Sequence, residues 1–354
     1  MAHKLYLRPI GMLYGATGAA AIAEGLALPL AGGPIAFTAA ELIEGGPSRT
    51  KRRLLSASEL AGSKDADLAQ VVSRIAAPRA PFAGLGLDRP LIMGIVNVTP
   101  DSFSDGGLYD TTEGAIVRAA ELAASGADIV DVGGESTRPG SDAVSDSDEL
   151  SRVLPVLDGL SRLNVAISID TRKSGVARAA AKKGAKIFND VSALTYDGDS
   201  LTAAVETGLS VVLMHAKGEP RTMQDNPAYG DVVLEVFDYL EERVGAATAA
   251  GIERMRIAAD PGIGFGKTMA HNLALLANLS LLHGLGVPLL IGASRKRFIR
   301  GISGGERARA REPGSQAAAI AAVAQGVQIL RVHGVSGIRQ ALEVWRASVT
   351  GAGA

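Results

Sequence analysis

The polar residues that could do chemistry in this chain recur at the ends of apolar segments. The clearest cases are Asn97, Asp131, Asp170, Asn189, Asp260, Lys296, Arg331 and His333. Cations beside a neutral amide oxygen are suited to a phosphate or pyrophosphate group, with room for a hard cation such as Mg²⁺ held mainly by substrate oxygens. Carboxylates and an amide that face inward are suited to the edge of a flat heterocycle with N–H donors.

The composition argues against several other chemistries. The chain of 354 residues has no cysteine, which excludes disulfides, thiolate catalysis and cysteine-based metal sites. Nothing resembles a Ser-His-Asp set or a cluster of three metal-binding histidines. Basic and acidic residues nearly cancel, at 36 against 37, so nothing indicates a nucleic-acid partner. A lone Asp or Asn at a strand end is more often a cap or turn residue, so only the whole set indicates a site.

Short apolar, β-branched segments precede these polar residues and alternate with Ala-rich segments of helical period. The apolar segments span residues 91–98, 128–133, 165–170, 186–191, 210–214, 256–260, 288–292 and 327–332. Near-continuous hydrophobicity, rather than strict alternation, is typical of strands buried on both faces of a parallel sheet. The sequence therefore predicts parallel strands with a polar group at the carboxyl end of each.

Eight such units match an α/β fold, the (β/α)₈ or TIM barrel, whose active site lies at the carboxyl ends of its strands. A glycine that could end a helix in the left-handed conformation stands before six of the strands, at Gly126, Gly184, Gly208, Gly251, Gly286 and Gly326. The competing architecture is a doubly wound open sheet. It would usually carry G-x-G-x-x-G after its first strand, where this chain has Asn97-Val-Thr-Pro100. We predict the barrel over residues 86–350.

Residues 1–85 lie outside the predicted barrel and form an N-terminal extension of unknown role. Two uncharged runs, 10–23 and 25–40, are interrupted by glycines or prolines, so we expect packed loops and short strands rather than a signal peptide. The basic cluster 49–53 and the Pro/Ala stretch near 78–81 are typical of a linker with a solvated surface. We expect a cytoplasmic protein without a membrane partner.

The motifs between residues 90 and 345 resemble those of the dihydropteroate synthases. The first two signatures are Asn97-Val-Thr-Pro-Asp-Ser-Phe-Ser-Asp-Gly-Gly107 and Asp131-Val-Gly-Gly-Glu-Ser-Thr-Arg-Pro-Gly140. Further blocks match in order at 168–171, 188–191, 213–215, 260–267, 294–296 and 331–333. The resemblance implies that 4-aminobenzoate is joined to 6-hydroxymethyl-7,8-dihydropterin pyrophosphate, which gives 7,8-dihydropteroate and pyrophosphate in folate synthesis. It also implies Mg²⁺ as cofactor, a homodimer and a sulfonamide target.

The same resemblance implies a role for individual residues. The pterin would be held by Asp170, Asn189, Met214, Asp260, Phe265 and Lys296. The pyrophosphate would be held by Asn97, Arg138, Arg331 and His333, with Asn97 also near Mg²⁺. The 4-aminobenzoate would lie among Phe103, Thr137, Arg138 and Pro139, on two loops. The catalytic set would be Asp101, Asp105, Arg138 and Lys296, in which either aspartate orders its loop or favours the developing cation.

Two departures and two rival functions stay open. Arg297 stands where Ser often follows the Ser-Arg-Lys block, which leaves the contacts to the aminobenzoate carboxylate undecided, and Gly334 stands where Asp is common. The nearest rival is a methyltetrahydrofolate-binding methyltransferase of the same pterin-binding superfamily, which would have no reason to keep the two loop signatures. The second rival is a catalytically inactive pterin-binding protein that supports a partner through residues 1–85.

Overall fold

The computed structural model describes residues 4–46, 49–99, 112–136, 141–219 and 221–351. Six of the predicted site residues lie outside the described ranges, namely Asp101, Phe103, Asp105, Thr137, Arg138 and Pro139.

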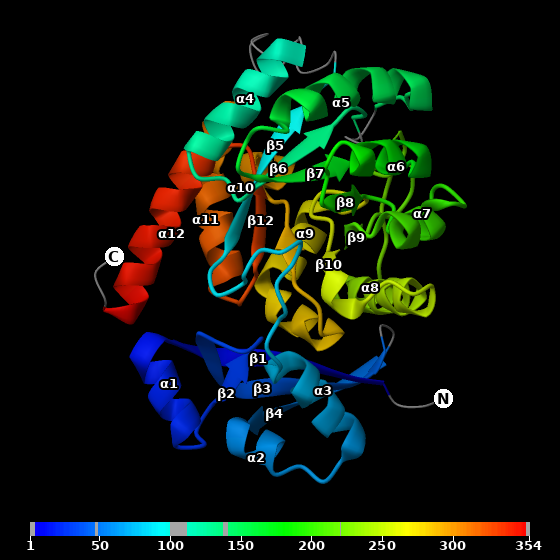
Figure 1. Cartoon of the computed structure of the whole chain (residues 1–354). Helices are drawn as coiled ribbons and strands as arrows, with labels where there is room; N and C mark the ends of the chain where they lie inside the picture. The colour runs from blue at the N-terminus through cyan, green and yellow to red at the C-terminus, as the bar shows by residue number, and fades with distance from the viewer. Residues whose placement is uncertain (1–3, 47–48, 100–111, 137–140, 220, 352–354) are drawn as a thin grey trace.

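The larger part of the molecule is a parallel barrel (Figure 1). Its strands are β5 (Leu91–Asn97), β6 (Ile129–Gly133), β7 (Ala166–Asp170), β8 (Ile187–Asp190), β9 (Ser210–Met214), β10 (Ile257–Asp260), β11 (Leu290–Ile291) and β12 (Ile329–Val332). They pair in the order β10-β9-β8-β7-β6-β5-β12-β11. A parallel bridge between Ala259 and Leu289 closes the ring. All eight strands lie inside the predicted apolar segments, so the predicted TIM barrel is confirmed.

Helices surround the barrel and connect its strands. They are α4 (Thr112–Ala124), α5 (Asp146–Leu160), α6 (Ser174–Lys182), α7 (Ser200–Thr207), α8 (Val232–Ala249), α9 (Met269–Ala277), α10 (Arg297–Ser303), α11 (Glu312–Val323) and α12 (Val335–Thr350), with the 3₁₀ turns η2 (Arg254–Arg256), η3 (Leu279–Leu285) and η4 (Ala308–Arg311). The six glycines predicted to precede strands all have left-handed backbones, with φ between 69° and 103°. Each therefore allows the turn from a helical segment into the next strand.

The two ends of the barrel interior differ in character. Side chains from seven strands, Met93 and Ile187 among them, pack inside the barrel around Phe82, whose side chain is fully buried. Phe82 pairs with Leu85 through two backbone hydrogen bonds of 2.9 Å, so a tight turn presents its ring to the strands. This apolar plug closes the end of the barrel at which the strands begin.

The N-terminal extension is a small antiparallel sheet with three helices. Its elements are β1 (Lys4–Tyr14), α1 (Gly15–Ala23), β2 (Leu28–Leu30), β3 (Ile35–Gly46), β4 (Arg49–Ser56), α2 (Ala57–Ala61) and α3 (Ala66–Ala76). The expectation of loops and short strands was wrong, because β1 and β3 have 11 and 12 residues. Gly11, at φ 66°, lies inside β1, and the pairs Ile10–Ala39 and Met12–Phe37 on either side stay in register. This glycine therefore bends the strand without ending it.

The basic cluster at 49–53 is not a linker, since β4 pairs with β3 along its whole length. Backbone pairing with an adjacent strand outweighs the weak strand preference of consecutive basic residues. The side chains of Lys51, Arg52 and Arg53 are exposed, so the expected solvated surface is confirmed.

The extension docks on the end of the barrel opposite the carboxyl ends of the strands (Figure 1). The Tyr6 hydroxyl donates to both carboxylate oxygens of Asp238 on α8, at 2.9 and 3.0 Å. The Tyr14 hydroxyl donates to the carbonyl of Ala324 after α11 at 2.9 Å. A second, mainly apolar cavity of about 310 Å³ lies between the extension, α12 and the residues that lead into β5 and β12.

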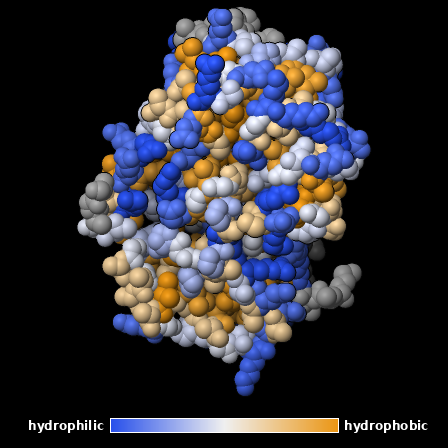
Figure 2. All heavy atoms as spheres, viewed as in Figure 1, coloured by the Kyte–Doolittle hydropathy of each residue, from blue (hydrophilic) through white to orange (hydrophobic). Residues whose placement is uncertain are grey.

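Apolar surface is spread over both the barrel and the extension in the space-filling view (Figure 2). Among the described residues, no helix has the length and apolar character needed to cross a membrane.

Candidate active site

A cavity of about 600 Å³ lies at the carboxyl ends of the barrel strands. Six of the predicted site residues line it, namely Asn97, Asp170, Phe265, Lys296, Arg331 and His333. Three others, Asn189, Met214 and Asp260, are at most 5% exposed and lie at the ends of β8, β9 and β10, beside the cavity rather than among its lining residues. The chain therefore brings together every predicted site residue that the structure describes.

Strand register sets Asn97, Asp170 and Asn189 in one row across β5 to β8. Asn97 pairs with Gly133, Gly133 with Asp170, and Asp170 with Asn189. Asn189 then pairs with Val212, two residues before Met214, which is the partner of Asp260. Four strands therefore place an amide, a carboxylate, a second amide and a second carboxylate around the carboxyl end of the barrel.

Arg331 is held by two acids. Its Nε donates to Asp131 and its Nη2 donates to Asp170, both at 2.6 Å. Burial works against the charge of Arg331, but the attraction of these carboxylates outweighs it and raises the pKa of the guanidinium. Burial also raises the pKa of Asp170, although Arg331 favours its ionised form. Arg331 is thus a fixed cation with further N–H donors beyond the two that these acids use.

Asp131 is a site residue whose role the sequence alone did not reveal. Its side chain is fully buried, and it accepts from Arg331 and from Asn189 Nδ2, the latter at 3.2 Å. Asp131 therefore orients two predicted site residues at once, the cation Arg331 and the neutral amide Asn189. Its acidic side chain inside an apolar strand segment was the available signal, but its partners depend on strands that are far apart in sequence.

Lys267 ties the glycine-rich loop after β10 to the end of β9. Its Nζ lies 2.8 Å from His215 Nδ1 and donates to the Phe265 carbonyl at 3.0 Å. Burial lowers the pKa of Lys267 to about 7, and burial with the neighbouring Lys267 lowers the pKa of His215 to about 3. His215 is therefore neutral near pH 7.

The opposite side of this loop carries Phe265 beneath a cation. Lys296 Nζ lies 4.1 Å from the centroid of the Phe265 ring, within the range of a cation–π contact. Burial raises the pKa of the nearby Asp260, while its hydrogen bond from Gly262 N at 2.7 Å and the charge of Lys296 oppose the shift. The Phe265 ring, the Lys296 ammonium group and the Asp260 carboxylate therefore lie close together on one side of the cavity.

His333 is held at the mouth of β12. Its Nδ1 lies 3.0 Å from the Ser294 hydroxyl, and its carbonyl accepts from Arg118 at 2.8 Å. The neighbouring Gly334 has a packing role, because a Cβ there would collide with the carboxylate of Glu312. Glu312 in turn accepts from Arg295 Nε at 2.9 Å. The departure at Gly334 thus makes room for a carboxylate supplied by α11.

Arg297, the other departure, lines the cavity and has an exposed side chain. It adds a cation at the opening, close to Lys296 in the sequence.

The described residues contain no group of three or more His, Cys, Asp or Glu side chains arranged to hold a metal ion. Asn97 offers one neutral oxygen at the cavity wall. One protein oxygen beside a polyphosphate fits Mg²⁺, which keeps several waters and binds mainly through substrate phosphates. The donor set therefore fits a magnesium ion that arrives with its substrate rather than a resident metal.

Comparison with known proteins decides the family. The model of the pterin binding enzyme family matches residues 93–333. The dihydropteroate synthase of Neisseria meningitidis serogroup C is 49% identical over 266 residues, which are 74% of this chain and 94% of that protein. The chain belongs to the dihydropteroate synthase family. It is therefore an enzyme, a transferase of folate synthesis, and the predicted family resemblance is confirmed.

Solved structures of this family agree with the barrel. A Xanthomonas albilineans dihydropteroate synthase with 4-aminobenzoic acid is 49% identical, covers 75% of this chain and 96% of its own, and superposes with a TM-score of 0.71. A structure of the enzyme from the same organism in complex with 7,8-dihydropteroate is 43% identical, covers 77% and 98%, and has a TM-score of 0.68. About a quarter of this chain thus lies outside the match, a share comparable to that of its N-terminal extension.

Proposed function

We propose that this enzyme joins 4-aminobenzoate to 6-hydroxymethyl-7,8-dihydropterin pyrophosphate and releases 7,8-dihydropteroate and pyrophosphate. The observation that carries the proposal is a single cavity of about 600 Å³ that combines Lys296, Arg331 and His333 with Asp170 and the Phe265 ring. Such a set can take a flat heterocycle and a polyanion together. The 4-aminobenzoic acid and the 7,8-dihydropteroate in the two Xanthomonas structures support the same substrate and product.

The pterin is assigned to the deep side of the cavity. Asp170, Asn189 and Asp260 offer acceptors and an amide to its N–H edge, and Lys296 offers a donor to its ring acceptors. Met214 and Phe265 would lie against the faces of the ring. The burial of these groups supports the assignment, because hydrogen bonds to charged groups are strong where water is excluded.

The pyrophosphate is assigned to Arg331, His333 and Asn97, together with Arg138. The pairing of Arg331 with Asp131 and Asp170 fixes the guanidinium before substrate arrives, so little reorganisation is needed when the leaving group gains charge. Mg²⁺, when bound beside Asn97, would neutralise part of the pyrophosphate charge.

The reaction itself needs little proton chemistry before attack. The bond between the pterin methylene carbon and the pyrophosphate oxygen breaks, and its electron pair leaves with pyrophosphate. The neutral amine of 4-aminobenzoate forms the new carbon–nitrogen bond and then loses a proton to water. Phe103, Thr137 and Pro139, with Arg138, are assigned to the aminobenzoate. Asp101 or Asp105 would order the loop or favour the cationic carbon, a role that their replacement by Asn would test.

The decisive experiment is a coupled product assay. The purified full chain is incubated with the pterin pyrophosphate, 4-aminobenzoate and Mg²⁺, and pyrophosphate and 7,8-dihydropteroate are measured together. We expect equal amounts of both products, none without 4-aminobenzoate, and inhibition by a sulfonamide that competes with 4-aminobenzoate. Failure to form either product under these conditions would rule out the proposed reaction.

The same preparation separates the two rival functions. A methyltetrahydrofolate-binding methyltransferase would bind methyltetrahydrofolate tightly and would release no pyrophosphate. An inactive pterin-binding partner would bind the pterin without turnover. The intact cation set in the cavity favours the synthase over both, because neither rival has use for a pyrophosphate site.

We further propose that the enzyme is a cytoplasmic homodimer. Exposed apolar side chains on α9 and α10, Met269, Leu273 and Ile302, support self-association, since each is 38–60% exposed. Sedimentation at micromolar concentration would give twice the mass of the 36.3 kDa chain if this is right.

A further inference from the structure

The cavity of about 310 Å³ between the N-terminal extension and the barrel contains no residue that the proposed reaction uses. None of the described residues lines both this cavity and the larger one. We call it the interface cavity, and its lining residues include Tyr14, Leu30, Arg79, Leu87, Val327 and Trp345. A cavity of about 150 Å³ can hold one benzene ring, so the interface cavity has room for a ring with a short side chain.

Most of the wall of the interface cavity is apolar. Leu30 comes from the extension, Leu87 from the segment that leads into β5, and Val327 from the turn before β12. The rings of Tyr14 and Trp345 form another part of the wall, with centroids 5.4 Å apart and planes at 82°. Aliphatic side chains beside an edge-on aromatic pair suit the hydrocarbon part of a ligand.

Arg79 brings a positive charge to this apolar wall. Its Nη1 donates to the carbonyls of Arg74 and Ala77, each at 2.9 Å, and its Nη2 donates to the carbonyl of His283 at 3.1 Å. Its Nε is buried and has no hydrogen-bond partner among the described residues. The partners of this guanidinium are thus neutral carbonyls, and a second N–H of Nη2 is left for a ligand.

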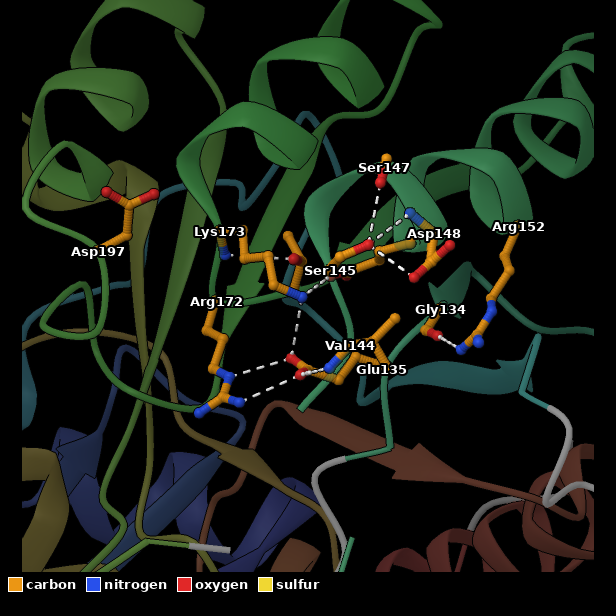
Figure 3. A network of polar contacts seen from close by, with 12 residues as sticks. Gly134, Glu135, Val144, Ser145, Ser147, Asp148, Arg152, Arg172, Lys173 and Asp197 are labelled. Atoms are coloured by element: carbon orange, nitrogen blue, oxygen red, sulfur yellow. Dashed lines mark hydrogen bonds and ion pairs between the residues drawn. The ribbon is translucent and has the colours of Figure 1, made fainter. Parts of the chain in front are cut away.

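The charge of Arg79 lacks the compensation that other buried guanidinium groups receive. Arg172 donates to both carboxylate oxygens of Glu135, at 3.0 and 3.1 Å, as Figure 3 shows. No carboxylate of the described residues pairs with Arg79 in this way. Burial lowers the pKa of Arg79 to about 10, and the positive charge of Arg254 adds to the shift. An anion inside the cavity would supply the missing opposite charge.

The other charged residues that line the interface cavity leave this charge in place. Arg89 pairs with Asp128 at 2.5 Å, and its hydrogen bond to Asp128 and the charges of Asp128 and Asp88 raise its pKa. Asp88 is the one acid among the described lining residues, so this acid is already engaged with Arg89. Arg346 adds an exposed cation from α12. The lining is therefore positive, with three arginines against one aspartate.

We propose that the interface cavity binds a small carboxylate that carries an apolar ring, with the carboxylate toward Arg79 and the ring beside Trp345. Such a ligand contacts the extension and the barrel at once, so its binding stabilises the docked arrangement of the two. The cavity shares no residue with the candidate active site, so occupancy leaves both KM values of the proposed reaction within about twofold.

The test uses the full chain and hydrocinnamate, a phenyl ring on a short chain that ends in a carboxylate. Hydrocinnamyl alcohol is its neutral match. Trp345 is the one tryptophan of the chain, so tryptophan fluorescence reports on this cavity. We expect hydrocinnamate to change the fluorescence with a Kd on the order of 1 mM. At about ten times that concentration it should raise the thermal midpoint by about 2 °C. The alcohol should bind about 10-fold more weakly.

Three variants locate the binding. Arg79→Met should bind the acid and the alcohol equally, because the charge that prefers the acid is gone. Val349→Phe fills the cavity from α12 and keeps the bonds of Arg79, so both probes should bind about 10-fold more weakly or less tightly still. Arg53→Met is the matched control, because Arg53 is exposed on β4 and does not line the cavity. It should bind both probes as the wild type does. If Arg79→Met does not fold, Val349→Phe and the two probes on the wild type decide.

Three results would overturn the inference. Equal affinity of the wild type for the acid and the alcohol would rule out a site for anions. Unchanged fluorescence and an unchanged thermal midpoint would rule out the site itself. Competitive inhibition against 4-aminobenzoate without a fluorescence change would place the probe in the active site instead. None of the binding measurements requires synthesis of dihydropteroate, so failure of the proposed function and failure of this inference are separate outcomes.

Discussion

The two ends of the barrel interior are lined by different kinds of side chain, charged at one end and apolar at the other. At the carboxyl ends of the strands, buried acids and bases compensate one another, as Asp131, Arg331 and Asp170 do. At the opposite end, Phe82 and apolar strand residues fill the interior. Buried ion pairs add little net stability, whereas apolar burial is the main source of it. We call the polar carboxyl end, with Asp131, Asp170 and Arg331, the rim, and the apolar end around Phe82 the floor. The rim therefore serves recognition, and the floor serves the stability of the fold.

The N-terminal extension packs at the floor end of the molecule and, like the floor, is expected to contribute to stability rather than to catalysis. Its strand β1 and helix α3 pack on η3, and α1 packs on α12. None of its described residues lines the 600 Å³ cavity, where the first lining residue along the chain is Ile95. We therefore expect changes in the extension or the floor to alter stability without altering kinetics, and changes at the rim to do the reverse.

The largest effect is expected at the floor, from Phe82→Ala. The ring is fully buried, so its removal leaves a cavity and should lower the free energy of unfolding by about 3–5 kcal/mol. The kcat of the folded enzyme at a low temperature should stay within about twofold. Urea unfolding followed by tryptophan fluorescence and a product assay on the same sample measure both.

Phe82→Leu is the milder companion, with an expected loss of about 1 kcal/mol. An equal loss for both variants would mean that the ring does not plug the barrel. A large fall in kcat at full folding would mean that floor and rim are coupled.

The next largest effect is expected at the rim, from Lys296→Met. An ammonium group that hydrogen-bonds a buried substrate contributes about 2–3 kcal/mol, so kcat/KM should fall by about 100-fold. The free energy of unfolding should change by less than about 1 kcal/mol. Arg300→Met is the control, because Arg300 is exposed on α10, which begins directly after Lys296, and pairs with Glu306. A fall of less than threefold in the kcat/KM of Lys296→Met would show that Lys296 does not bind the substrate.

The sequence predicted the barrel and the N-terminal extension unequally well. The strands could be found because hydrophobic runs and left-handed glycines are local signals. The extension could not, because Gly11 inside β1 and the basic run of β4 oppose strand formation locally and are outweighed by pairing with β3. Pairing between strands far apart in the sequence cannot be recognised from a short segment alone.

In the candidate site, too, the contacts between residues far apart in the sequence could not be predicted. Asn97, Asp170 and Arg331 could be selected as candidates because a barrel presents its strand ends at one rim. Asp131 and Lys267 were visible inside a strand segment and in a motif, but their partners were not. Arg331 lies 200 positions from Asp131, and Lys267 lies 52 positions from His215. Only closure of the barrel creates those contacts.

A smaller effect is expected in the pH dependence of stability, again at the rim. Burial lowers the pKa of Lys267 to about 7 from its ordinary value of 10.5. Between these values the unfolded chain binds a proton that the folded chain has released, so stability should rise as the pH rises from about 7 to about 10. Lys267→Met should remove this rise. Lys217→Met, at a half-exposed lysine nearby, should keep it. Identical pH profiles for all three proteins would show that Lys267 does not titrate in this window.

The smallest effect is expected where the extension meets the barrel, from Tyr6→Phe. This change removes only the hydroxyl that donates to Asp238 and keeps the ring packed edge-on against Phe237, with centroids 5.4 Å apart. One hydrogen bond to a charged, partly exposed acceptor should be worth about 1–1.5 kcal/mol of unfolding free energy. Arg52→Met breaks the exposed pair of Arg52 with Asp231 across the same interface and should cost at most about 0.5 kcal/mol. Both variants should keep the wild-type kcat and both KM values. If Tyr6→Phe instead shifts a KM, the extension acts on the rim through α8, and the division between a stabilising floor and a chemical rim does not hold for this enzyme.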